Sequence, residues 1–205
     1  MINKRQVTDN IIQYQFSYMR ENIFYLKNQE ILIDTGSPNA KSELKEIIKQ
    51  INITKIIITH SHFDHIGNID IFKNTPIIMS KTSKEIVTKN KDEYMLFNWI
   101  GSEVVEVSTD QISTKFKHKQ LQIINTPGHL TGSIVIYDKN NKFLFTGDLI
   151  FGPTSIGRTD IPGSDKNEMK QSLQKLLELE IHAILPGHGE ICYEKNIVSK
   201  ALKIL

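Results

Sequence analysis

The sequence predicts an α/β protein with two β-sheets and helices on their outer faces. Short apolar runs rich in β-branched residues recur along the 205 residues, and amphipathic segments lie between several of them. A strand–helix–strand order spans residues 30–59, which is typical of parallel strands joined by a crossover helix. No repeat, linker or low-complexity tract interrupts this order, so we expect one domain over residues 1–205.

The N-terminal half begins with strands and contains one clear amphipathic helix. Leu44, Ile47 and Ile51 recur at helical spacing, which predicts a helix over residues 38–50. Ser37 is expected to cap this helix, with a proline in the first position, where its fixed φ suits the first turn. The expected strands are residues 11–18, 22–26, 30–34, 55–59 and 76–79, and the shorter expected helices are residues 66–72, 81–89 and 92–99.

The C-terminal half is expected to alternate short strands with two helices. Asn140 and Asn141 predict a hairpin turn between strands at residues 133–137 and 142–145. Further expected strands are residues 104–107, 114–118, 121–125 and 183–185, and the expected helices are residues 166–179 and 195–205.

Composition places the chain among ordinary globular proteins. Hydrophobic residues make up 39% of the chain and charged residues 23%. The net charge of +2 is too small to favour binding to nucleic acid or to a membrane surface. No apolar run approaches the roughly 20 residues that span a bilayer. The polar start has no apolar leader segment, so we expect a cytoplasmic location.

The segment of residues 60–65, in the N-terminal half, carries the strongest chemical signal. His60, His62, Asp64 and His65 follow the apolar run 56–58 directly. In an extended segment residues i and i+2 point the same way, so the first two histidines can bind one metal ion. Asp64 and His65 lie past the turn and can face a second ion. Imidazoles and carboxylates crowded at the end of a strand are hard to explain without a metal.

Three later residues follow the same pattern of apolar strand, glycine and ligand-type side chain. They are His129, Asp148 and His188. His129 would complete the first ion site and His188 the second, while the two oxygens of Asp148 suit a bridge. The single cysteine, Cys192, excludes a thiolate site, and imidazole with carboxylate suits zinc, iron or manganese. We therefore expect two divalent ions, zinc first among them.

Together these motifs resemble the metallo-β-lactamase superfamily. The HxHxDH cluster at residues 60–65, Pro-Gly-His at 127–129, Gly-Asp at 147–148 and Pro-Gly-His-Gly at 186–189 follow the order of that family. The resemblance implies a four-layer αββα sandwich with a dinuclear centre at the edge between two sheets. It implies that the first ion is held by His60, His62 and His129, the second by Asp64, His65 and His188, and that Asp148 bridges them.

Two further segments resemble the hydroxyacylglutathione hydrolases, also called glyoxalase II. They are Thr-Pro-Gly-His-Leu-Thr-Gly-Ser at residues 126–133 and Gly-Arg-Thr-Asp at residues 157–160. This resemblance implies hydrolysis of a small-molecule thioester. It also implies that a bridging hydroxide attacks the carbonyl while a thiolate leaves, and that Asp64 orients the hydroxide.

Substrate contacts are less clearly encoded. Arg158 is a candidate contact for a substrate carboxylate, and the alternative is an ion pair with Asp160. The full-length glutathione-specific enzymes carry an additional C-terminal helical domain. Another thiol carrier is therefore the alternative to glutathione.

Other functions share parts of this pattern. A persulfide dioxygenase shares the Gly-Arg-Thr-Asp motif and uses one iron, whose ligands would match His60, His129 and Asp148. The full ligand set favours the dinuclear hydrolase. A lactonase or β-lactamase is a second alternative, and a metal-binding scaffold without enzymatic activity is a third.

Overall fold

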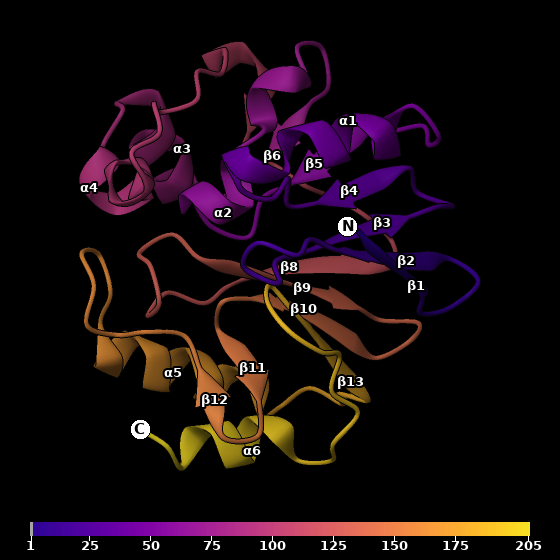
Figure 1. The fold of residues 1–205 in the computed structure, drawn as a ribbon. Coiled ribbons are helices and arrows are strands. Elements are labelled where there is room, and N and C mark those ends of the chain that lie inside the picture. Colours follow the sequence, from indigo (N-terminus) through magenta and orange to yellow (C-terminus); the bar gives the residue numbers. More distant parts are fainter. Residues whose placement is uncertain (1) are drawn as a thin grey trace. The chain divides into compact units, whose positions relative to one another are not determined.

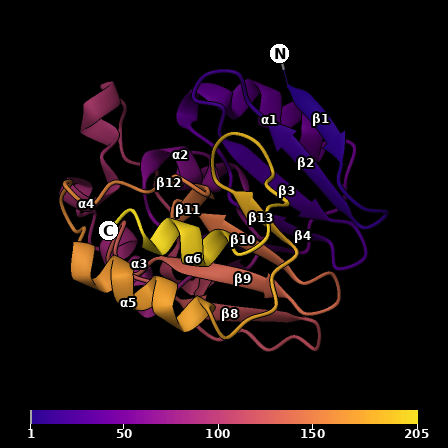
Figure 2. The same cartoon turned by 90° about the horizontal axis from the view of Figure 1, so that it is seen from below.

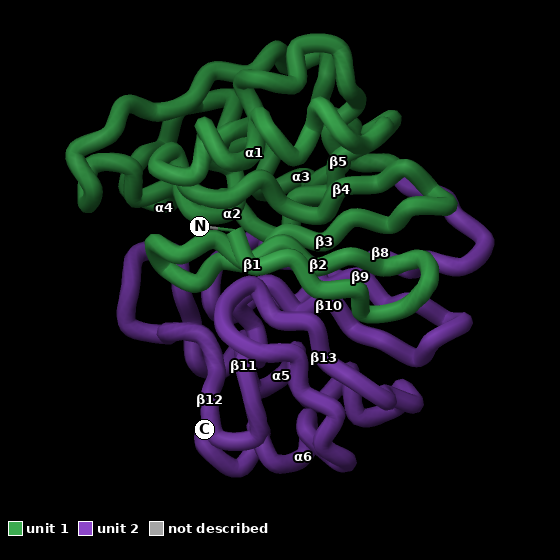
Figure 3. The backbone as a smooth tube through the Cα atoms, turned by 45° about the vertical axis from the view of Figure 1, so that its right-hand side comes forward, with its two compact units in different colours: residues 1–115 green, residues 116–205 purple. Residues whose placement is uncertain are grey.

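The computed structural model of the chain describes residues 2–205, which form two compact units (Figure 3). The first unit ends at Lys115 and the second begins at Phe116. Each unit contains one main β-sheet and its own helices (Figure 1). No helix within residues 2–205 is long and apolar enough to cross a membrane. One domain over residues 1–205 stays a prediction.

The described part of the first unit contains one seven-stranded sheet whose strands follow chain order. Each of the first three strands is antiparallel to the next, and the pairs from β4 to β7 are parallel. Tight connections permit the antiparallel pairs, whereas parallel pairs need longer crossovers. The strands are β1 (Asn3–Gln6), β2 (Ile11–Gln15), β3 (Asn22–Leu26), β4 (Ile31–Ile33), β5 (Lys55–Ile57), β6 (Ile77–Ile78) and β7 (Ile112–Ser113).

Helix α1 (Lys41–Ile48) is the crossover between β4 and β5, and it buries Leu44 and Ile47. The predicted parallel pairing of these strands around an amphipathic helix is therefore confirmed. The other α-helices described in this unit are α2 (Phe63–Ile66), α3 (Lys81–Thr88) and α4 (Asp92–Met95). Short 3₁₀ helices occur at Pro38–Ala40, Ile69–Ile71, Phe97–Ile100 and Thr109–Gln111.

The strand register of the first unit brings several chain segments to one edge of its sheet. Ile33 pairs with Ile57, and Ile57 pairs with Ile78, all in parallel. The residues that follow β4 and β5 consequently leave the sheet at the same edge. Carboxyl ends of parallel strands are where α/β proteins usually build their sites.

The second unit has a four-stranded sheet of order β13-β10-β9-β8. Only the β10–β13 pair in this sheet is parallel. Two helices cover one face (Figures 1 and 2), where Leu173 and Val198 pack into a core with Ile184. The elements are β8 (Leu121–Asn125), β9 (Ile134–Asp138), β10 (Phe143–Gly147), β11 (Ile150–Gly152), β12 (Ser155–Ile156), α5 (Lys166–Leu176), β13 (Ala183–Pro186) and α6 (Ile197–Leu202).

Some local expectations are wrong. The predicted strands at residues 104–107 and 114–118 are absent, and only the short strand β7 lies between them. Alternating polarity favours an extended chain, but a strand also needs a hydrogen-bonded partner. Ser37 does not cap the helix that begins at Pro38, because its hydroxyl donates to Glu21 Oε1 at 2.7 Å.

Candidate metal centre

In the first unit, four of the expected metal ligands are buried just beyond β5. His60 and His62 lie in the extended segment after the strand, where side chains two positions apart share a direction. His60 Nε2 and His62 Nδ1 are 3.0 Å apart. Two nitrogen ligands of a tetrahedral zinc ion, each bound at about 2.0–2.1 Å, lie about 3.3 Å apart. This pair therefore fits binding to one ion.

Asp64 and His65 lie in the first turn of α2, which begins after His62. His65 Nε2 is 4.0 Å from Asp64 Oδ1, so these two ligand atoms face one another. Thr35 holds this short helix in place, because its backbone N–H and its hydroxyl donate to the carbonyl oxygen of His65 at 2.8 and 2.9 Å.

Asp34 is a residue of the candidate site that sequence reasoning missed. Its Oδ2 accepts a hydrogen bond from His65 Nδ1 at 2.8 Å. A carboxylate only accepts, so Nδ1 carries the proton and Nε2 keeps its lone pair for a metal. The missed signal was its position: Asp34 follows an apolar strand, as the other ligand-type residues do.

Asp34 also reaches a second imidazole through Thr59. The Thr59 hydroxyl donates to Asp34 Oδ2 at 2.8 Å and lies 3.2 Å from His60 Nδ1. Because the hydroxyl proton points to Asp34, the Thr59 oxygen is the acceptor for His60 Nδ1–H. One buried carboxylate thus sets the tautomer of two histidines, and both present Nε2 as a ligand atom.

In the second unit, Asp148 lies between two histidines. Its Oδ2 is 3.6 Å from His129 Nε2 and 3.6 Å from His188 Nε2. The parallel β10–β13 register explains part of this arrangement, because Gly147 pairs with Pro186 and accepts a hydrogen bond from Gly187 N–H at 2.8 Å. The ligand-type residues that follow these two strand ends are therefore neighbours.

The turn that carries His129 is clamped against α5. The carbonyl of Gly128 accepts from Asp165 N–H at 2.8 Å, and the carbonyl of Pro127 accepts from the Ser172 hydroxyl at 2.6 Å. Gly128 has a φ of 139°, and a Cβ there would lie 2.3 Å from Met169 Cα. Only glycine allows this close approach, which explains the glycine before His129.

His129 is also fixed by the Gly-Arg-Thr-Asp segment. Its Nδ1 lies 3.0 Å from the carbonyl oxygen of Arg158, which can only accept, so Nε2 again presents the lone pair. A Cβ at Gly157 would lie 1.9 Å from the carbonyl oxygen of Asp148 and 2.9 Å from the His129 ring. The motif therefore contacts two expected ligands through its backbone.

The side chain of Arg158 pairs with Asp160, the alternative that the sequence had left open. Arg158 Nε and Nη2 each donate to one oxygen of Asp160 at 2.9 Å. These hydrogen bonds are the main reason why the pKa of Arg158 is raised and the pKa of Asp160 is lowered. Contact of Arg158 with substrate stays a prediction.

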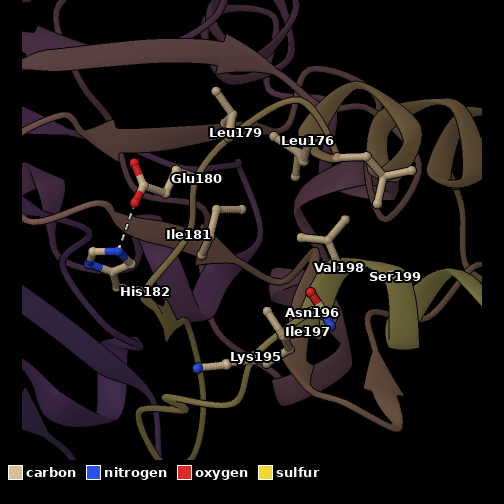
Figure 4. Close-up of a pocket in the computed structure, with 11 residues that line it drawn as sticks. Leu176, Leu179, Glu180, Ile181, His182, Lys195, Asn196, Ile197, Val198 and Ser199 are labelled. Atoms are coloured by element: carbon tan, nitrogen blue, oxygen red, sulfur yellow. Dashed lines mark hydrogen bonds and ion pairs between the residues drawn. The ribbon is translucent and has the colours of Figure 1, made fainter.

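A separate pocket in the second unit involves none of the expected ligands (Figure 4). Its walls include Leu176, Leu179 and Ile181. Glu180 and His182 also line it, and His182 Nε2 lies 3.1 Å from Glu180 Oε1. His182 is exposed, so it offers a control for the buried or half-buried histidines of the candidate metal centre.

The chain belongs to the metallo-β-lactamase superfamily, since the model of that family matches residues 20–188. The crystal structure of TTHA1623 in a di-iron-bound form has a TM-score of 0.71 with this chain and 24% sequence identity, covering 92% of this chain and 94% of that one. Likeness at this level of identity supports the fold alone. The predicted metallo-β-lactamase fold, of the α/β class, is confirmed.

Two relatives have names that state a type of enzymatic activity. A probable metallo-hydrolase of Methanocaldococcus jannaschii is 34% identical over 193 residues, which cover 86% of this chain and 90% of the relative. An acyl-coenzyme A thioesterase of Gallus gallus is 25% identical over 178 residues, which cover 71% of this chain and 62% of the relative.

Proposed function

We propose that this protein is a metal-dependent hydrolase that cleaves small-molecule thioesters at a dinuclear centre. The observation that carries the proposal is the carboxylate of Asp148 beside the Nε2 atoms of both His129 and His188. The buried imidazoles of the first unit, with tautomers set by Asp34, support it. The name of the archaeal relative, a probable metallo-hydrolase, agrees with this class of reaction.

The proposed ligand set follows the family pattern. Nitrogen and carboxylate donors without sulfur suit zinc, which we propose as the metal, with iron or manganese as the alternatives. The di-iron form of TTHA1623 keeps iron among them. His60, His62 and His129 are proposed to bind the first ion, Asp64, His65 and His188 the second, and Asp148 both.

The two ions would supply a water of lowered pKa as nucleophile and positive charge for the oxyanion that forms at the substrate carbonyl. Asp64 is proposed to accept a hydrogen bond from the attacking water and so to orient it. A thiol has a pKa of about 8.5, so the thiolate leaves without a general acid. A thioester is therefore a suitable substrate for a site whose residues are all metal ligands.

Two features support thioesters as the substrate class, and the first of them favours the S-2-hydroxyacylglutathione type. One is the resemblance of residues 126–133 and 157–160 to hydroxyacylglutathione hydrolases. The other is the avian relative, which is named an acyl-coenzyme A thioesterase and keeps coenzyme A open as the thiol. The thiol carrier is thus the main variable to test.

The test is a hydrolysis screen with metal quantification on the purified full chain. S-lactoylglutathione and acyl thioesters of coenzyme A are the substrates, with a lactone and a β-lactam as comparison. We expect thioester cleavage with two metal ions per chain. His188→Ala should lower metal content and activity together, whereas the exposed control His182→Ala should change neither.

Two outcomes would replace the proposal. One iron per chain with oxygen uptake in the presence of a persulfide would indicate a persulfide dioxygenase. Metal-loaded protein that cleaves no thioester, lactone or β-lactam and consumes no oxygen would indicate a metal-binding scaffold.

A further inference from the structure

The geometry points to Arg158 and Asp160 as positioning residues for His129, a role exerted through the backbone of Arg158 and not through contact with substrate. The inference rests on the proposed function in one respect, namely that His129 binds a metal ion. It concerns the hydrogen bond between His129 Nδ1 and the carbonyl oxygen of Arg158, which measures 3.0 Å.

The ion pair encloses the peptide unit that makes this hydrogen bond. Arg158 and Asp160 are two positions apart, and two donors of one side chain meet two oxygens of the other. The carbonyl that accepts from His129 belongs to the peptide between positions 158 and 159. That peptide lies inside the ring that the ion pair closes, so the pair restrains its rotation.

The segment is anchored on both sides of this ring. On one side, the β11–β12 hairpin returns the chain so that Gly157 N–H donates to the carbonyl of Leu149 at 3.3 Å. On the other side, the carbonyl of Gly163 accepts from Thr131 N–H at 2.7 Å. Between these anchors, the described hydrogen bonds of Arg158 join it to His129 and Asp160.

The ion pair itself contributes little to global stability. Both side chains are largely exposed, at 61% and 70%, and exposed ion pairs are weak because water screens them. A bidentate arginine–carboxylate pair nevertheless has a strongly preferred geometry. Its effect is therefore local: it orients one carbonyl, which orients one imidazole.

The first measurement is metal affinity, by competition with a chromophoric chelator. Asp160→Asn and Arg158→Gln should each weaken binding by about threefold to tenfold, less than the roughly 10–100-fold that follows loss of a direct ligand partner. The double variant should be no worse than either single variant, because both remove one interaction. The exchanged pair Arg158→Asp with Asp160→Arg should recover most of the affinity.

The second measurement is the tautomer of His129 in the metal-free protein, observed by ¹⁵N NMR of the imidazole. The natural chain should show a protonated Nδ1, and the single variants should show a mixture of tautomers. The control is Glu180→Gln, which removes another exposed ionic partner in the same unit and should leave both measurements unchanged.

Unchanged metal affinity and an unchanged tautomer in Asp160→Asn would overturn the inference. A rise in KM confined to Arg158→Gln, with normal metal binding, would instead make Arg158 a substrate contact. If the natural chain binds no metal, the proposed function fails, but the tautomer of His129 still decides the positioning role.

Discussion

Asp34 Oδ2 and His65 Nδ1 are joined by a 2.8 Å hydrogen bond between residues 31 positions apart. Both side chains are buried, with exposed fractions of 3% and 1%. Because β4 and β5 are parallel and in register, the residues after the two strands meet, and the carboxylate of one segment orients the imidazole of the other. A residue outside the expected ligand set thus decides which nitrogen of an expected ligand is available.

Asp34→Asn should weaken metal binding by about 10–100-fold, the usual cost of losing such a partner. Asparagine tolerates the φ of 60° at this position, so the backbone should persist. The neutral amide accepts less strongly from His65 and Thr59, which should lower the free energy of unfolding by about 1–3 kcal/mol. Chelator competition and urea denaturation provide the measurements.

Asp70→Asn is the matched control for this variant. Asp70 pairs with Lys41 at 2.7 Å in a partly exposed ion pair, so its loss should cost no more than about 1 kcal/mol and leave metal affinity unchanged. Equal metal affinity in Asp34→Asn and the natural chain would contradict the positioning role of Asp34.

Periodicity predicted the elements that have both a pattern and a partner. The strand at residues 22–26 is confirmed with the same bounds, and the helix predicted at residues 166–179 is α5, which ends three residues earlier. Strands β1, β11 and β12 were missed, since all four residues of β1 are polar and exposed and the other two strands are only three and two residues long. Whether such a segment forms a strand depends on the strand with which it pairs. The pattern of a single sequence does not reveal that partner.

In the candidate site, the expected ligands were easier to predict than the groups that form hydrogen bonds to them. His129 and His188 could be found because glycine and an apolar strand precede each of them. The carbonyl of Arg158 could not be found in this way, since any residue has one and only the folded hairpin brings it to His129. The type of a side chain indicates whether it can be a ligand. Its orientation depends on neighbours that only the folded chain brings together.

Gly157→Ala should lower metal content although it removes no ligand. The added Cβ would lie 1.9 Å from the carbonyl oxygen of Asp148, so the backbone beside Asp148 and His129 must move. Gly152→Ala in the same hairpin is the control, since a Cβ there meets nothing within 4 Å. Mass spectrometry of metal content should show a loss in the first variant alone, and equal content would exclude this packing role.

Alkaline pH should destabilise the protein partly through Tyr137. Burial raises its pKa, and the charges of Glu180 and Asp138 raise it further. Tyrosine in the unfolded chain ionises at about pH 10, so this contribution to stability is complete below that pH and is lost as pH rises toward the folded pKa. The free energy of unfolding should therefore fall above about pH 10.

Tyr137→Phe should make that decline shallower, at the cost of the 2.7 Å hydrogen bond to the carbonyl of Glu180. The loss at neutral pH should be about 0.5–1.5 kcal/mol. Tyr193→Phe, at an exposed tyrosine, is the control. Denaturant unfolding at pH 7 and above pH 10 measures how far the free energy of unfolding falls between the two pH values. An equal fall for Tyr137→Phe and the natural chain would refute the assignment to Tyr137.

Removal of metal should lower the melting temperature. At a free metal concentration of 100 times the dissociation constant, binding adds about 2.7 kcal/mol to the free energy of unfolding. For a chain of this size that corresponds to about 5–11 °C. Calorimetry before and after chelation measures the shift, and His188→Ala should show a smaller one. An unchanged melting temperature would mean that metal does not stabilise the folded chain.

The position of β13 has a kinetic consequence. β13 is an edge strand of its sheet and pairs with β10. Ile184 in this strand also forms two backbone hydrogen bonds with Cys192. All four residues of β13 are buried, and buried core strands open at close to the free-energy cost of unfolding the whole fold. Since His188 follows β13, this strand keeps the expected ligand beside Asp148 as long as the core is intact. Release of an ion bound by His188 should consequently be slow, at a rate that tracks global unfolding.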